Sequence, residues 1–431
     1  MQNLKKYHSI MNDLYQIDEK VIHFVDECEK QLEEKFERIS DISQYNQIKI
    51  LKAMQDAKLA STDFNWTTGY GYGDIGREKV EEIYAHIFGV EDALVRPNIV
   101  SGTHAISLSL FSLLKPGDHL LSLTGRPYDT LLKVIGVEGN ATGTLMDFGV
   151  VYSEVPLKNS SINLDAFNSH IQKNTKVVMI QRSTGYSDRR AFTIEEIREA
   201  IDKIKSINKE IIVFVDNCYG EFTATIEPSQ IDADIVAGSL IKNPGGGLAY
   251  SGGYIVGKHQ FIEACASRLT APGIGRDCGL TFGMTRQILQ GLFMAPKVVE
   301  DALKSALLFS KAFEKLGFEC IPSSTDERSD IILAIKLNSP KILNEFCKYI
   351  QFSSPVDSIF TPVPWDMPGY EDQVIMAAGG FIEGSSIELS SDGPMREPYY
   401  VYYQGGLTYY HGKFALNHVL SNLMDKGFVQ F

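Results

Sequence analysis

Residues 211–247 read IIVFVDNCYGEFTATIEPSQIDADIVAGSLIKNPGGG, and this stretch decides the fold that the sequence predicts. It contains two short apolar runs, 211–216 and 235–237, separated by a more polar connection. Both runs are rich in β-branched residues, which favours strands. They are also too apolar for a sheet with one face in water. Such strands are typical of a parallel sheet that helices cover on both faces.

The same alternation of short apolar runs and longer mixed segments extends over residues 92–260. We expect strands at 93–96, 119–123, 132–137, 150–155, 177–181, 211–216, 235–237 and 253–256. Helices are expected between them at 103–114, 164–172 and 194–207. This order predicts an α/β fold with a doubly wound, mostly parallel sheet. Ligands of such sheets bind beyond the carboxyl ends of the strands, where Asp216 is placed.

With the α/β domain, the sequence predicts three parts in all. Residues 1–60 form an N-terminal helical segment, residues 61–295 the large α/β domain, and residues 296–431 a smaller C-terminal α+β domain. The last part starts with a long helix at 296–316 and contains strands at 374–377, 387–389 and 399–403.

Composition narrows the class of protein. The chain has 431 residues, with 41 basic against 54 acidic side chains, and a net charge of −13 argues against a nucleic-acid or anionic-membrane surface. Its polar start lacks the apolar core of a signal peptide, and no apolar run has the length of a membrane span. The six cysteines are scattered and the nine histidines show no ligand spacing, so we expect no metal and a reducing, cytoplasmic location.

Lys242 and Asp216 carry the chemistry of the opening stretch. The lysine stands in a loop of small residues, 26 positions after the acid (242 − 216). A lysine there can hold pyridoxal 5'-phosphate as a Schiff base, with its pKa lowered by burial and by the cofactor's cation, while the acid keeps the pyridine nitrogen protonated. The alternatives are a surface lysine before a glycine turn and an acid that caps a turn.

Two neighbouring features suit the same cofactor. Gly102 and Thr103 open a helix whose backbone N–H groups can bind a phosphate, which the hydroxyl of Ser239 can also reach; a plain helix cap is the alternative. Tyr128 follows a strand and can stack on a pyridine ring, unless it is merely half-buried in its turn.

Two further features concern the substrate and a second subunit. Arg396 suits the carboxylate of an amino acid as well as it suits a surface salt bridge. Tyr70, Tyr72 and Arg77 lie on a glycine-rich loop that predicts a site edge or a subunit contact, with simple packing as an equal alternative.

Four longer motifs carry a resemblance to a known family. They are TTGYGYGDIGRE at 67–78, VDNCYGEF at 215–222, SLIKNPGGGLAYSGGYIVG at 239–257 and TAPGIGRD at 270–277. Over residues 60–405 the chain resembles the fold-type-I pyridoxal-phosphate enzymes of the cysteine/methionine-metabolism group. Within this group it is most similar to the methionine gamma-lyase-like branch of aluminium-resistance proteins.

This resemblance implies an aspartate aminotransferase-type large domain and a role for each candidate. Lys242 would bind the cofactor covalently and remove the substrate's Cα proton, Asp216 would pair with the pyridinium, and Tyr128 would stack and assist as acid. Gly102, Thr103 and Ser239 would bind the phosphate, and Arg396 the substrate carboxylate.

The resemblance also implies a homo-oligomer, a dimer of dimers in which Tyr70 or Tyr72 with Arg77 complete the neighbouring subunit's site. The spacing of these residues departs from the Tyr-x-Arg of the wider group. The segment 181–186, QRSTGY, departs from the group's asparagine-containing segment.

The function expected from these features is a carbon–sulfur lyase acting on cystathionine, cysteine or a methionine-like amino acid by β- or γ-elimination. An aminotransferase or aldolase would keep the cofactor and change the reaction. A non-catalytic pyridoxal-phosphate-binding protein would show no turnover.

Overall fold

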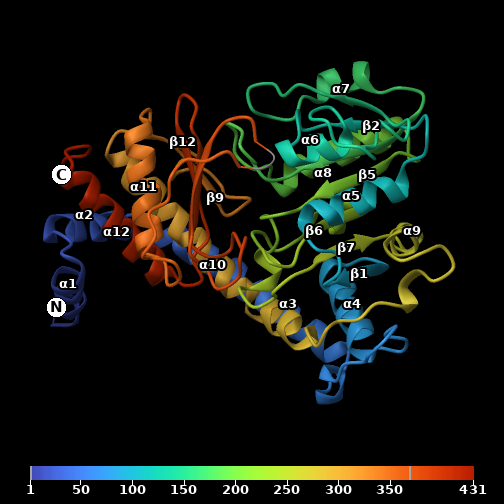
Figure 1. Ribbon diagram of the computed structural model, residues 1–431, viewed down its shortest axis with the longest axis horizontal. Coiled ribbons are helices and arrows are strands. Elements are labelled where there is room, and N and C mark those ends of the chain that lie inside the picture. The colour runs from blue at the N-terminus through green and yellow to red at the C-terminus, as the bar shows by residue number, and fades with distance from the viewer. Residues whose placement is uncertain (1, 368–369) are drawn as a thin grey trace. The chain divides into compact units, whose positions relative to one another are not determined.

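The computed structural model describes residues 2–367 and 370–431, which divide into two compact units (Figure 1). One unit comprises the residues up to Ser43 together with Lys297–Phe431, and the other comprises Gln44–Pro296. The first helices thus belong with the C-terminal residues, whereas the end of the predicted N-terminal segment belongs with the α/β unit. Two long helices, α3 (Glu33–Asp56) and α10 (Thr285–Lys315), run across the division.

The unit Gln44–Pro296 is built on a seven-stranded sheet in the order β1-β7-β6-β5-β4-β2-β3. Its strands are β1 (Asp92–Arg96), β2 (His119–Ser122), β3 (Val151–Glu154), β4 (Thr175–Gln181), β5 (Ile212–Asp216), β6 (Ile235–Ser239) and β7 (Gly253–Gly257). Pairs among β3, β2, β4, β5 and β6 are parallel, and only the pairs of β7 are antiparallel. The predicted mostly parallel α/β sheet is confirmed.

Helices cover both faces of this sheet, as β7 illustrates. Tyr254 packs against Tyr84 and Phe88 of helix α4 (Ile75–Phe88). Its neighbour Ile255 joins the apolar cluster that contains Ala105 of helix α5 (Gly102–Leu113). Successive side chains of a strand point to opposite faces, so α4 and α5 lie on opposite sides. The other helices of this unit are α6 (Asp129–Ile135), α7 (Leu164–His170), α8 (Ile194–Ile207) and α9 (His259–Leu269), with the short turns η1 (Ser61–Phe64), η2 (Pro228–Ile231), η3 (Asn243–Gly245) and η4 (Gly275–Asp277).

The strand predicted at 132–137 was wrong, because these residues lie in or just after helix α6. Leu131, Leu132 and Ile135 are buried, and their spacing of three and four residues forms one helical face. Gly136, at φ 98°, ends the helix in the left-handed conformation that glycine adopts without strain. The apolar run was too short for its period to separate a helix from a strand.

The other unit is an α+β fold, as predicted. Its five strands, in the order β10-β11-β12-β9-β8, pair antiparallel throughout. They are β8 (Glu319–Ile321), β9 (Ile332–Lys336), β10 (Val374–Ala378), β11 (Ser390–Pro394) and β12 (Tyr400–Gln404). The sheet shares an apolar core with α2 (Glu19–Lys30), α11 (Pro340–Phe352) and α12 (Tyr409–Asp425); α1 (Gln2–Tyr15) precedes them.

Two predicted boundaries in this unit were wrong. The strand expected at 387–389 begins only at Ser390. Just before it, the carboxylate of Glu388 accepts the backbone N–H groups of Phe381 and Ile382 and so holds the preceding loop. The long helix α10 starts at Thr285 and continues through Pro296, where a start had been expected. Proline removes one helical hydrogen bond without ending a helix that packing sustains. In the described part of the chain, none of the helices is both long and apolar enough to cross a membrane.

Candidate active site

The candidate site lies at the carboxyl ends of strands β4, β5 and β6. Asp216 is the last residue of β5 and pairs in register with Gln181, the last residue of β4. Ser239 ends the neighbouring strand β6. Asp216 and Ser239 are buried, at 3% and 1% exposure. The parallel order of the strands therefore brings an acid, an amide and a hydroxyl to one edge of the sheet.

Lys242 lies three residues beyond the end of β6, directly before the turn η3. Its side chain is half-buried, and Nζ lies 3.8 Å from the centroid of the Tyr219 ring. The adjacent amide of Asn243 donates hydrogen bonds of 2.9 Å to the carbonyl oxygens of Tyr219 and Glu221. The lysine loop is thus tied to the loop that follows Asp216.

Gly102 shows how closely the start of α5 approaches these loops. A Cβ atom at this position would lie 3.1 Å from Sγ of Cys218, 3.3 Å from Cβ of Ser239 and 3.9 Å from Nζ of Lys242. A side chain here would therefore fill the space between the helix start and the lysine. Ser101 caps the helix by accepting the N–H of His104 at 3.0 Å. The helix cap considered in the sequence is therefore present together with the free space at Gly102.

Tyr128 is held against the same helix start. Its hydroxyl lies 3.2 Å from Oγ1 of Thr103, and its backbone N–H donates to Oε1 of Gln181 at 3.1 Å. Burial and the nearby charge of Asp216 raise the pKa of the Tyr128 phenol, so this group carries its proton at neutral pH. Gln181 positions Tyr128, a role that the sequence did not indicate.

Burial and charge set the protonation of the two central groups. Burial raises the pKa of Asp216, while Lys242 and the N–H of Cys218, at 3.1 Å, oppose that shift. The pKa of Lys242 is raised: burial acts to lower it, but Cys218, Tyr219, Asp216 and Tyr128 outweigh burial. The lowered pKa expected from the sequence depends on burial together with the cofactor's cation; without that cation, the neighbouring groups raise the pKa of Lys242.

A buried polar cluster that the sequence analysis missed supports the loop after Asp216. Arg182 is 1% exposed and donates from Nη1 to Oδ1 of Asn217 (2.8 Å) and to the carbonyl of Gly220 (2.9 Å). The amide of Asn217 donates in turn to Glu227 at 2.9 Å. The only signal in the sequence was a charged residue directly after an apolar strand.

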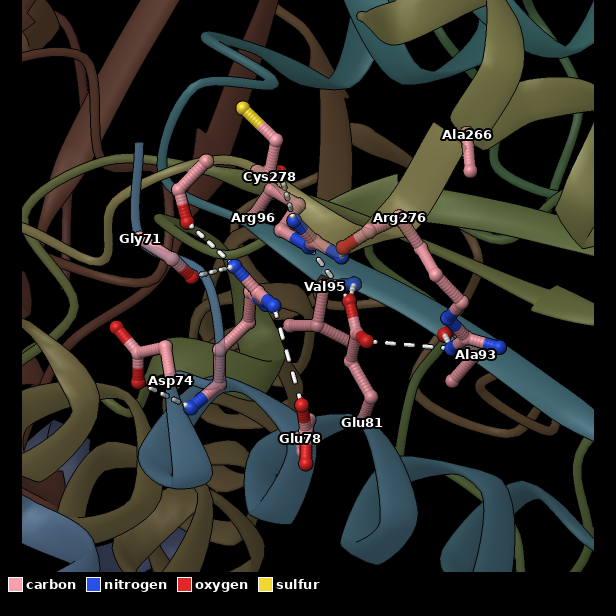
Figure 2. A network of polar contacts seen from close by, with 12 residues as sticks. Gly71, Asp74, Glu78, Glu81, Ala93, Val95, Arg96, Ala266, Arg276 and Cys278 are labelled. Carbon is pink, nitrogen blue, oxygen red and sulfur yellow. Dashed lines mark hydrogen bonds and ion pairs between the residues drawn. The ribbon is translucent and has the colours of Figure 1, made fainter. Parts of the chain in front are cut away.

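Buried hydrogen bonds hold the backbone of residues 67–74, the tyrosine loop. Figure 2 labels Gly71 and Asp74 of this loop, which take part in these bonds. Arg77 is 2% exposed, and its guanidinium donates to the carbonyl oxygens of Gly71 (2.7 Å), Gly279 (3.0 Å) and Asp277 (3.2 Å). Tyr70 and Tyr72 are exposed, at 72% and 62%, with ring centroids 5.7 Å apart. Of the three residues predicted on this loop, Arg77 is thus buried and holds the loop, whereas Tyr70 and Tyr72 expose their rings.

Next to this brace, Arg276 organises a second group of charges. It pairs with Asp92 at 2.5 Å, with Glu81 at 3.2 Å and with Glu263 at 3.5 Å (Figure 2 shows the Glu81 contact). Asp92, Glu263 and His259 bring ligand atoms within 4.8 Å of one another. The guanidinium of Arg276 already supplies the positive charge at this place.

Arg396 belongs to the other compact unit. Its side chain is half exposed and pairs with Asp372 at 3.0 Å. The surface salt bridge considered for Arg396 is therefore present, and its partner is Asp372.

Comparison with known proteins assigns the chain to a family. Residues 21–424 match the methionine gamma-lyase family. The chain is 51% identical over 391 residues to YnbB, an uncharacterized protein of Bacillus subtilis, covering 90% of this chain and 93% of YnbB. The structure of a carbon-sulfur lyase involved in aluminum resistance from Clostridium novyi is also similar, with a TM-score of 0.93 and 46% identity over 98% of this chain and 99% of that one.

A more distant structure supports the fold alone. The pyridoxal-5'-phosphate-dependent protein YhfS of Escherichia coli has a TM-score of 0.62 at 15% identity, with 90% of this chain and 97% of that chain covered. The chain therefore belongs to the methionine gamma-lyase family, and it is an enzyme of the lyase class with the fold of type I pyridoxal-phosphate enzymes.

Proposed function

We propose that this protein is a pyridoxal-phosphate-dependent carbon–sulfur lyase that acts on a sulfur amino acid by β- or γ-elimination. One observation carries the proposal: a lysine amine, a buried carboxylate and a helix N-terminus meet at one edge of the sheet, with Gly102 leaving the space between them open. The name of the Clostridium novyi relative, a carbon-sulfur lyase, agrees with this reaction class.

The residues of the site fit the cofactor by their chemistry. Nζ of Lys242 would bind it covalently, and Asp216 would face the pyridine nitrogen. Burial raises the pKa of Asp216 in the protein without cofactor. A protonated pyridine nitrogen beside it would oppose that shift and favour the ionised carboxylate. The start of α5 at Gly102 and Thr103, with the Ser239 hydroxyl, would bind the phosphate. Tyr128 would stack on the ring.

When bound, the cofactor supplies an electron sink for the substrate's Cα. With the cofactor in place, the amine Nζ of Lys242 would act as the general base that takes the substrate's Cα proton. The hydroxyl of Tyr128, whose raised pKa keeps it protonated, would donate its proton to the departing sulfur. Thr103, 3.2 Å from that hydroxyl, orients it.

The site is completed, in this proposal, by a second copy of the chain. Tyr70 and Tyr72 are large, exposed rings on a braced loop, which suits insertion into a neighbouring subunit. Arg77 would act by holding that loop, and the assembly would be a dimer of dimers. Arg396 would bind the substrate carboxylate in place of its present partner Asp372.

The test is a substrate panel. The protein loaded with pyridoxal phosphate is incubated separately with cystathionine, cysteine and methionine, and released thiol and keto acid are both measured. We expect thiol and keto acid together from at least one of them. Keto acid without thiol would point to an aminotransferase, cleavage between carbon atoms to an aldolase, and no product to a binding protein, and each of these would overturn the proposal.

A further inference from the structure

Tyr219 is the one aromatic ring seen directly against the lysine amine among the described residues. Nζ of Lys242 lies 3.8 Å from the centroid of that ring, well inside the range of a cation–π contact. Both side chains are half-buried, so water screens this contact less than it would a surface pair.

The residue that makes this contact, Tyr219, also has a strained backbone. Its φ is +71°, in the left-handed region that side chains other than glycine rarely adopt. The next residue, Gly220, has to be a glycine, because a Cβ there would lie only 2.6 Å from Cδ of Arg182. Strain of this kind persists only where surrounding contacts impose it, and it is concentrated at functional sites.

Two polar contacts impose this conformation. The Asn243 amide donates to the carbonyl of Tyr219 at 2.9 Å, and Arg182 donates to the carbonyl of Gly220 at 2.9 Å. The first of these donors is the residue next to Lys242. The lysine loop therefore holds the very backbone that points the ring at the lysine.

We propose that the face of the Tyr219 ring is the docking position of the Lys242 ammonium, which makes Tyr219 a positioning residue for the lysine whenever Nζ carries no covalent partner. The titratable groups that interact with Nζ are Asp216 at the end of β5, Cys218 and Glu221 in the loop that follows, Tyr219 itself, and Tyr128 at the start of α6. Of these, the ring of Tyr219 stabilises the charged amine without taking up its proton.

The consequence for the reaction rests on the proposed function. Nζ must lose its proton to water before it can add to the cofactor's aldehyde, and that addition then releases one water molecule. A docked ammonium slows this capture. In turnover, the same ring would receive Nζ after it has taken the substrate's Cα proton, and would keep the proton within reach of the reacting atoms.

The contact is tested first without any cofactor. In protein stripped of pyridoxal phosphate, competitive labelling of amines with acetic anhydride over a range of pH, read by mass spectrometry of the Lys242 peptide, reports the apparent pKa of Nζ. We expect Tyr219→Leu to lower that pKa by about one unit and Tyr219→Phe to leave it unchanged. Leucine and phenylalanine meet the same backbone strain as tyrosine, so only the ring differs.

Two glycine variants test whether relief of backbone strain by itself changes the pKa of Lys242. Tyr219→Gly removes both the ring and the strain and should lower the pKa of Lys242 as Tyr219→Leu does. Asp232→Gly relieves a φ of +70° at an exposed position away from the site and should leave it unchanged. A wild-type value in Tyr219→Leu, or a lowered value in Tyr219→Phe, would overturn the proposal. Circular dichroism establishes that each variant is folded.

Capture of pyridoxal phosphate gives the second readout. At neutral pH, Tyr219→Leu should capture the added cofactor about tenfold faster than the wild type, because one pKa unit changes the uncharged fraction tenfold. If no protein, wild type included, captured the cofactor, the proposed function would fail while the labelling result stood. If capture proceeded but labelling were equal in all variants, only the docking role would fail.

Discussion

The backbone N–H of Tyr128 donates a hydrogen bond of 3.1 Å to the side-chain oxygen of Gln181, and this bond joins the start of helix α6 to the end of strand β4. Gln181 is buried at 4% exposure, and its own amide donates to the carbonyl of Ser183 at 3.2 Å. The side chain of Gln181 thus helps to position Tyr128 at the edge of the sheet.

Replacing Gln181 by methionine should leave the N–H of Tyr128 without an acceptor. We expect a loss of about 1–3 kcal/mol in the free energy of unfolding, since a buried donor is left unpaired. Thiol release should fall as the phenol loses its position. Chemical denaturation and the thiol assay measure the two effects. Gln172→Met, at an exposed position, is the matched control, and an equal loss there would contradict the assignment.

Lys242→Ala should abolish both covalent cofactor binding and turnover. The visible absorbance band of protein-bound pyridoxal phosphate should disappear, because the amine that would form the Schiff base is removed. Lys242→Arg should do the same, since it preserves the positive charge and removes the nucleophilic amine. Lys209→Ala, at an exposed position, should keep the band. A band that persisted in Lys242→Ala would refute the role of this lysine.

Glu221 predicts a pH dependence of stability. Its carboxyl is fully buried and hydrogen-bonded by the Tyr254 hydroxyl at 2.6 Å, and burial raises its pKa to about 8. The folded protein therefore binds this proton more tightly than the unfolded chain does. The stabilising contribution is fully present below the ordinary carboxyl pKa, and it is lost as pH rises towards about 8.

Glu221→Gln removes that titration and retains an acceptor for Tyr254. As the pH is raised from about 5 to about 9, the melting temperature of Glu221→Gln should fall less than that of the wild type. Thermal unfolding across this range is the measurement. Glu210→Gln, which changes an exposed carboxylate, should follow the wild-type curve. Parallel curves for wild type and Glu221→Gln would show that Glu221 does not titrate as described.

Arg77→Lys should loosen the tyrosine loop. A lysine has no planar fork with which to reach the carbonyl oxygens of Gly71, Gly279 and Asp277 together. We expect a loss of about 1–3 kcal/mol in the free energy of unfolding. Cleavage by chymotrypsin after Tyr70 or Tyr72 should become faster in the folded protein. The half-exposed Arg126, changed to lysine, is the control, and equal cleavage rates in both variants would argue against the brace.

The sequence by itself determined the features that depend on neighbours along the chain. The apolar run closed by Asp216, the small-residue loop around Lys242 and the cap before Gly102 are local patterns, and each was placed in its expected element. Where a local pattern was ambiguous, as in the short run 132–137, the prediction was wrong, because a helix and a strand bury such a run equally well.

Only the tertiary structure decided which of these residues meet. The contacts of Tyr128 with Gln181 and of Lys242 with Tyr219 depend on the order of the strands, β2-β4-β5-β6, which no local pattern encodes. The strained φ of Tyr219 and the commitment of Arg77 to backbone carbonyls are likewise imposed by distant partners. Packing of the whole unit stabilises these conformations, and the residues involved would not adopt them in isolation.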